Sequence, residues 1–136
     1  MTYKNKTLAT FLAVMLGSLG IHRFYLEGKR DPWAWLHFAS LPLSLLWSHY
    51  FFGWPVLLTY SPLLLSFFAA LLEALVAGLT PDEKWDHRHN PVSGRTNHSS
   101  WPLALLLVLT TGLGATALIA VIARAFDLLY TGGAYG

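Results

Sequence analysis

The sequence predicts an all-α integral membrane protein, a bundle of four transmembrane helices with a short interfacial helix between the third and the fourth. Of the 136 residues, 54% are hydrophobic and only 12% are charged, about half the charged fraction of a typical soluble domain. The apolar residues also fall into long runs separated by short polar segments, which is how a chain that crosses a bilayer repeatedly is organised.

The first helix is predicted over about residues 7–25. Ala9, Ala13 and Gly17 recur every four residues in its apolar part, which places small side chains on one face where a neighbouring helix can pack closely. A basic start followed by a short apolar run is also typical of a secretory signal peptide. The small-residue face favours a retained, packed helix.

The second and third helices are predicted over residues 33–52 and 62–79, and a polar turn at residues 22–32 precedes them. Each has roughly the 20 residues needed to cross the hydrocarbon core. Pro42 predicts a kink near the middle of the second helix. The first unit of the chain is thus predicted over residues 1–79 and contains these two helices and the first helix.

The rest of the chain is predicted to contain a polar loop, one more span and a tail. In the loop at residues 80–100, Thr80 and Glu83 have the spacing of a capping box and predict a short helix at the membrane surface. The fourth transmembrane helix is predicted over residues 101–130. The glycine-rich segment 131–136 is predicted to be a flexible tail.

Four crossings predict that both termini lie on one side of the membrane and that the loops 22–32 and 80–100 lie on the other. The loops hold six Lys and Arg residues and the terminal segments hold three. Because basic residues concentrate on the cytoplasmic side, the count predicts cytoplasmic loops and non-cytoplasmic termini in a multi-pass protein of the cell (inner) membrane.

Residues 17–26 read Gly-Ser-Leu-Gly-Ile-His-Arg-Phe-Tyr-Leu. This string resembles the TM2-domain family, in which a short polar turn joins two membrane helices and an acidic residue lies late in the following membrane segment. The resemblance covers about residues 3–79, and residues 80–91 are similar to a segment of bacterial members, so the chain resembles a longer bacterial variant. The motif residues are Gly17, Gly20, His22, Arg23, Phe24 and Tyr25.

The chain departs from the family pattern at two places. Glu27 stands where the family usually has glycine, and residues 33–79 are long enough for two spans instead of one. The resemblance implies Glu73 as the acidic residue. It implies membrane insertion but no particular molecular activity.

Glu73 is the most informative polar residue, because an unpaired carboxylate inside a span is costly. The predicted topology places it near the first polar loop. We therefore expect Glu73 to form an ion pair with Arg23, in a polar cluster with His22 and His37. This cluster is interpreted either as a pin that fixes helix register or as a proton or ion relay.

Other polar residues suggest weaker sites. Lys29, Arg30, Lys84 and Arg88 are candidates for contacts with lipid headgroups. His87, His89 and His98 are weak metal-ligand candidates, because their spacing lacks a matched second pair. Two histidines at a similar depth, His22 and His37, leave a haem-binding alternative open.

The leading functional prediction is a non-enzymatic membrane protein, an accessory or structural component or a small homo-oligomer. No convincing nucleophile–base set and no phosphate-binding glycine loop occurs, and the absence of cysteine excludes thiol chemistry. No basic run suggests a nucleic-acid partner, so membrane lipids and other membrane subunits are the expected partners, and no cofactor is expected. The alternatives are a channel or transporter that uses the polar cluster, and a haem- or lipid-binding membrane protein.

Overall fold

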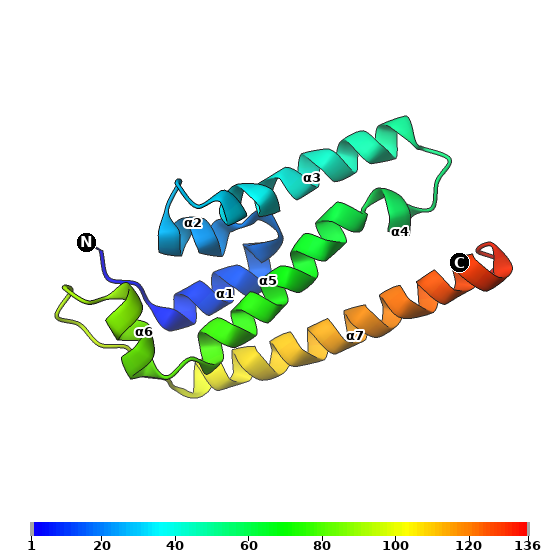
Figure 1. Cartoon of the computed structure of the whole chain (residues 1–136). Helices are drawn as coiled ribbons and strands as arrows, with labels where there is room; N and C mark the ends of the chain where they lie inside the picture. Colours follow the sequence, from blue (N-terminus) through cyan, green and yellow to red (C-terminus); the bar gives the residue numbers. More distant parts are fainter. Residues whose placement is uncertain (1, 136) are drawn as a thin grey trace.

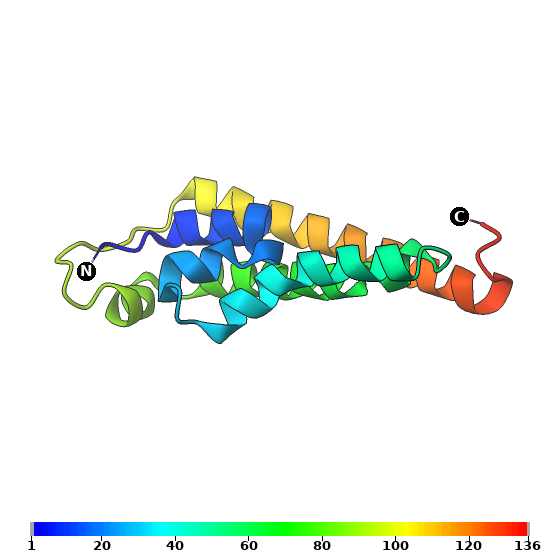
Figure 2. The ribbon, with the colours of Figure 1, turned by 90° about the horizontal axis from the view of Figure 1, so that it is seen from above.

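The computed structural model describes residues 2–135, and this part of the chain is helical with no strand. The helices form an elongated bundle (Figures 1 and 2). Its elements in chain order are α1 (Lys6–Leu16), the 3₁₀ turn η1 (Gly17–Leu19), α2 (Ile21–Glu27), α3 (Pro32–Tyr50), α4 (Val56–Thr59), α5 (Ser61–Leu79), α6 (Asp82–His89) and α7 (Trp101–Thr131).

The first apolar run is a helical hairpin and not one long helix. The helix α1 ends after 11 residues, and Gly20 adopts a left-handed conformation with φ 73° that residues with a Cβ rarely adopt. The chain reverses there, so that α2 runs back beside α1 (Figure 1). The predicted continuous helix over residues 7–25 is therefore wrong, and α1 alone has only about half the length that a crossing requires.

The small-residue face of α1 packs against α5, as the four-residue spacing predicted. Ala9 and Ala13 are each 1% exposed. On the facing helix, Ala70 and Ala74 are equally buried. Close approach of the two backbones thus holds the hairpin against the centre of the bundle.

Two helices of the described residues, α5 and α7, are long and apolar enough to cross a membrane. The helix α3 also has 19 residues and packs beside α5, and it continues through Pro42. It carries more polar side chains, including His37, Ser40 and Ser44, which are buried. The structure thus supports an all-helical fold with two candidate spans among the described residues, and the predicted bundle of four spans is not confirmed.

The two termini lie at opposite ends of the bundle (Figures 1 and 2). The N-terminal segment, the turn at residues 28–31 and α6 lie at one end, which we call the charged end. The backbone N–H of Lys4 donates to Asn90 Oδ1 at 2.7 Å across this end. Four crossings would place both termini at the same end, whereas the hairpin returns the chain to its starting end before three long helices follow. The side of the membrane on which each terminus lies stays a prediction.

The predicted short helix after residue 80 is present as α6, but it has no capping box. Thr80 donates its hydroxyl to the Val76 carbonyl instead, and no side chain caps the start of α6. At the end of α7, the backbone N–H of Tyr135 donates to Asp127 Oδ1 at 3.2 Å. The predicted flexible tail therefore begins as a hydrogen-bonded turn, and its last residue, 136, lies outside the described residues.

Candidate functional site

Glu73 is the centre of a polar cluster that joins α2, α3 and α5. Its Oε2 lies 2.6 Å from His22 Nε2 and accepts a hydrogen bond from Arg23 Nη1 at 2.9 Å. Its Oε1 lies 3.3 Å from His37 Nε2. The structure therefore brings together the four residues that the sequence predicted as a cluster, with the expected Arg23–Glu73 ion pair. Their functional role stays a prediction.

The turn at Gly20 places His22 and Arg23 against α5. A Cβ on Gly20 would lie 2.5 Å from the carbonyl oxygen of Ala34. The backbone of Gly20 at the tip of the hairpin therefore packs directly against the backbone at the start of α3. His22 is 3% exposed, and its Nδ1 is the one buried side-chain polar atom without a hydrogen-bond partner among residues 2–135. The Nε2 atom is thus the ring nitrogen that ties His22 to Glu73.

The cluster extends to Asp31, which the sequence analysis did not identify. Arg23 Nε donates to Asp31 Oδ2 at 2.6 Å, and Asp31 Oδ1 accepts the Trp33 backbone N–H at 3.1 Å. Burial raises the pKa of Asp31, but the hydrogen bonds from Arg23 and Trp33 outweigh burial and hold it below its usual value. The sequence signal was an Asp directly before a helix-starting proline, which is an N-cap position.

On the other side of Glu73, hydrogen bonds tie the hairpin tip to α3 and α5. The Ser66 hydroxyl donates to the Ser18 carbonyl at 2.6 Å, and it lies 2.6 Å from His37 Nδ1. The Ser40 hydroxyl lies 3.3 Å from the same carbonyl. Through Ser18, His37 and Glu73, one continuous polar network therefore connects the hairpin with two long helices.

The aromatic residues of the motif have separate packing roles. The Phe24 ring meets the Trp35 ring of α3 edge-on, with ring centroids 5.1 Å apart. The Tyr25 hydroxyl accepts the backbone N–H of Asn5 at 2.9 Å, and the Lys4 ammonium lies 4.7 Å from the centre of the Tyr25 ring. The string of six motif residues thus builds the turn, the cluster and the contacts of the hairpin.

A second ionic contact closes the charged end. Lys6 is 2% exposed, and its Nζ lies 2.5 Å from Asp82 Oδ1 and donates to the Thr80 carbonyl at 2.8 Å. Ser99 donates to Asp82 from both its backbone and its hydroxyl. Burial raises the pKa of Asp82, but the bonds from Lys6 and Ser99 lower it to about 2. Sequence reasoning missed this contact because it placed Lys6 on the other side of the membrane.

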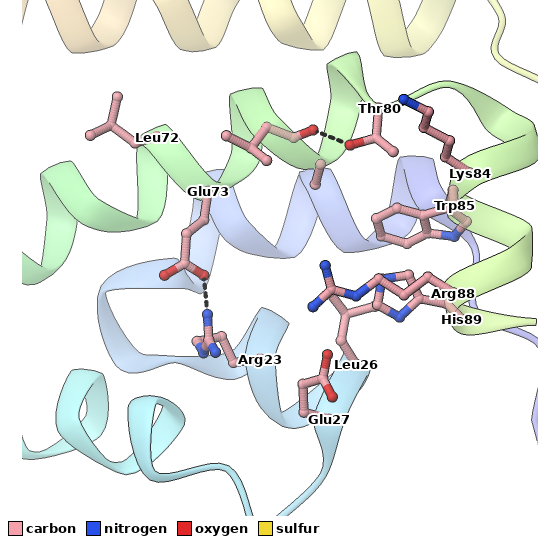
Figure 3. A pocket seen from close by; sticks show the side chains of 12 residues that line it. Arg23, Leu26, Glu27, Leu72, Glu73, Thr80, Lys84, Trp85, Arg88 and His89 are labelled. Carbon is pink, nitrogen blue, oxygen red and sulfur yellow. Dashed lines mark hydrogen bonds and ion pairs between the residues drawn. The ribbon is translucent and has the colours of Figure 1, made fainter.

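A cavity of about 290 Å³ lies between α2, α5 and α6 at the charged end (Figure 3). Among the headgroup candidates, Lys84 and Arg88 line it, whereas Lys29 and Arg30 lie outside it on the exposed turn before α3. Glu73 lines both this cavity and a groove of about 420 Å³ between α3 and α5. The cluster thus stands between the charged end and the flank of the bundle.

The three candidate metal ligands are not brought together. His87 is exposed, His89 packs on Trp85 with ring centroids 4.4 Å apart, and His98 Nε2 lies 3.2 Å from Thr96 Oγ1. No group of three His, Cys, Asp or Glu residues between residues 2 and 135 is arranged to hold a metal ion.

The geometry of His22 and His37 does not suit haem binding. The rings of His22 and His37 are 5.7 Å apart between centroids, and both Nε2 atoms face the carboxylate of Glu73. Neither ring nitrogen therefore faces the other across a space that a haem would fill.

Residues 2–57 match the family model of the TM2 domain, as the motif predicted. The matched segment contains the hairpin, α3 and the start of α4. It ends before α5, so that Glu73 and Asp82 lie outside it. No curated protein and no solved structure matches the chain.

Proposed function

We propose, from the TM2 domain that the chain carries over residues 2–57, that this is a multi-pass membrane protein. In the proposed topology α3, α5 and α7 cross the bilayer, and the α1–α2 hairpin enters and leaves on the same side. The apolar length of α5 and α7 supports two of these crossings. The equal length of α3 and its position beside α5 support the third.

The distribution of basic residues supports the proposed orientation of the chain in the membrane. Eight of the nine Lys and Arg residues precede α7 and belong to the hairpin and the segments at the charged end, and Arg124 alone lies late in α7. Because basic residues mark the cytoplasmic side, we place the charged end in the cytoplasm and the C-terminus outside. The asymmetry is larger than the sequence count of six against three, because Lys4 and Lys6 join the loops.

We infer a non-enzymatic, structural or accessory role in the cell (inner) membrane of a bacterium. The polar atoms of the Glu73 cluster are directed at one another and hold the hairpin against α3 and α5. Breaking a buried ion pair leaves an uncompensated charge, which is strongly destabilising. The cluster thus supports a pin that fixes the hairpin. The long exposed flank of α7 is available to lipid, another membrane subunit or a second copy.

One observation favours a second candidate function, a proton or ion path. Glu73 lines both the cavity at the charged end and the groove between α3 and α5, as a relay carboxylate would. A flux assay in proteoliposomes separates the two functions. A relay requires that Glu73→Gln abolish a measurable flux while the chain still folds, whereas a pin requires that the substitution lower the folded yield with no flux in the wild type.

The absence of cysteine makes the proposed topology directly testable. Single cysteines at four exposed positions are labelled with a membrane-impermeant maleimide, from either face of membrane vesicles. The variants are Thr2→Cys, Val92→Cys, Phe52→Cys and Ala134→Cys. We expect the first two to react from the cytoplasmic face and the last two from the opposite face.

Residue 2 is decisive in this experiment. A bundle of four crossings requires Thr2→Cys and Ala134→Cys to react from the same face, whereas the hairpin requires opposite faces. Labelling of all four positions from both faces of sealed vesicles, or release of the chain from membranes by alkaline carbonate, contradicts the proposed membrane insertion altogether.

A further inference from the structure

The cavity between α2, α5 and α6 contains unpaired charges of both signs. Lys84 and Arg88 are four residues apart on α6 and line the same cavity, since residues at this spacing share a helix face. Glu27, at the end of α2, lines it from the other side (Figure 3). None of the ion pairs of residues 2–135 includes Lys84, Arg88 or Glu27. Two cations and one carboxylate are thus free to bind a ligand.

The remaining charged residues of the cavity already have partners. Arg23 is bound to Asp31 through Nε and to Glu73 through Nη1. The carboxylate of Glu73 is further contacted by His22 and His37. A ligand therefore meets Lys84 and Arg88 as its cationic contacts and Glu27 as its anionic contact.

The wall of the cavity is apolar and continues onto the flank of α5. Leu72 and Val76 line the cavity and are 64% and 69% exposed. In the proposed topology this flank faces the acyl chains of the cytoplasmic leaflet. A ligand whose polar part lies in the cavity thus has room for hydrocarbon along α5, which favours an amphiphile over a soluble anion.

We propose that this cavity binds the headgroup of an aminophospholipid, which combines a phosphate diester with a primary ammonium group. The phosphate contacts Lys84 and Arg88, the ammonium donates to Glu27, and the acyl chains follow Leu72 and Val76. A purely anionic headgroup places no cation at Glu27, and a quaternary ammonium cannot donate a hydrogen bond to it. This inference rests on the proposed topology, which places the charged end at the cytoplasmic leaflet.

The test is lipid retention by the full chain in detergent. The protein is supplied with an equimolar mixture of phosphatidylethanolamine, phosphatidylglycerol and phosphatidylcholine, and the lipids that remain bound are quantified by native mass spectrometry. We expect the wild type to retain phosphatidylethanolamine preferentially. The double variant Lys84→Gln/Arg88→Gln should retain it about tenfold less, whereas the control Lys29→Gln/Arg30→Gln, which removes two basic residues outside the cavity, should behave as the wild type.

Glu27→Gln tests the ammonium contact at an exposed residue whose change leaves the packed interior intact. We expect this variant to lose the preference for phosphatidylethanolamine over phosphatidylglycerol. Equal retention of the three lipids by the wild type, or retention by the Lys84/Arg88 variant equal to that of the control, overturns the inference. Displacement of the lipid by soluble phosphoethanolamine at equal concentration shows that the ligand is not a lipid and also overturns it.

The two proposals fail in different ways. Maleimide labelling that contradicts the hairpin topology removes the proposed function. Correct labelling together with unselective lipid retention removes the headgroup site alone.

Discussion

Gly17 packs so tightly on Ala70 that a Cβ on the glycine would lie 2.5 Å from the Cβ of the alanine. Real Cβ atoms do not approach this closely, so a larger residue must push the hairpin away from α5. The contact lies at the point where α1 becomes the 3₁₀ turn, directly before the residues of the polar cluster. The position of the polar cluster thus depends on residue 17 being a glycine, which has no side chain.

We expect Gly17→Ala to destabilise the protein by about 1–3 kcal/mol, as overpacking of a close contact does. The matched control is Gly112→Ala in α7, where a Cβ meets nothing within 4 Å and alanine should be neutral or slightly stabilising because of its higher helix propensity. Apparent melting temperature in detergent, followed by circular dichroism, measures both. Equal stability of the two variants would contradict the close contact.

Replacement of Glu73 by glutamine removes the negative charge that Arg23 and the two histidines face. Loss of one partner of a fully buried ion pair costs about 3–5 kcal/mol. The Glu73 side chain is 32% exposed, and solvent screening reduces the expected loss to about 1–3 kcal/mol. Folded yield after detergent extraction and melting temperature are the measurements.

The control for Glu73→Gln is Glu83→Gln on the exposed side of α6, where no ion pair of the described residues is removed. Both variants lose one negative charge, so a general effect of net charge appears in both. A loss of stability in the Glu73 variant alone indicates the pin. Equal, unchanged stability of both rules out a structural role of the cluster.

The sequence was sufficient to predict the polar cluster but not the topology around it. An acidic residue inside an apolar run requires a partner, and the His-Arg pair after a glycine-rich segment was the nearest candidate. The reversal at Gly20 was not predicted, because hydropathy counts apolar residues and is insensitive to backbone direction. Because the chain reverses at one left-handed glycine, Gly20, the N-terminus lies at the opposite end of the bundle from the C-terminus, and not at the same end as predicted.

The same error explains one of the two contacts that sequence reasoning missed. With Lys6 assigned to the opposite side from Asp82, their ion pair could not be considered. Asp31 was treated as the end of a loop, although an Asp before a proline is a common helix N-cap. The Asp31 cap could thus have been recognised from the local sequence pattern alone, whereas the contact between Lys6 and Asp82 required the correct number of crossings.

The ion pair between Lys6 and Asp82 predicts a pH dependence of stability. The pKa of Asp82 is lowered from 3.8 to about 2 in the folded protein. A group whose pKa is lower in the folded state stabilises the fold above its unfolded pKa, and this contribution is lost as the pH falls toward the folded value. We expect the Asp82 contribution to be present above about pH 4 and to disappear as the pH falls to about 2.

Asp82→Asn isolates this contribution, because the amide cannot take up the proton. The melting temperature of the variant should be lower than that of the wild type at pH 7, and the difference should shrink as the pH falls from about 4 to about 2. Glu83→Gln serves as the control, because it removes an exposed carboxylate of the same helix that takes part in no ion pair of the described residues. A difference between Asp82→Asn and wild type that is independent of pH would contradict the contribution of the Asp82 charge.

Gly20→Ala tests the turn on which the reversed topology depends. The left-handed conformation costs a residue with a Cβ roughly 1–2 kcal/mol, and the new Cβ would also lie 2.5 Å from the Ala34 carbonyl oxygen. Gly132 adopts the same left-handed conformation, with φ 67° and ψ 18°, but a Cβ there meets nothing within 4 Å. Gly132→Ala therefore measures the backbone strain alone. We expect both variants to be destabilised, with the larger fall in melting temperature for Gly20→Ala, because only there does a steric clash add to the strain. If the first apolar run were one continuous helix, Gly20→Ala would instead raise stability, since alanine favours a helix interior more than glycine does.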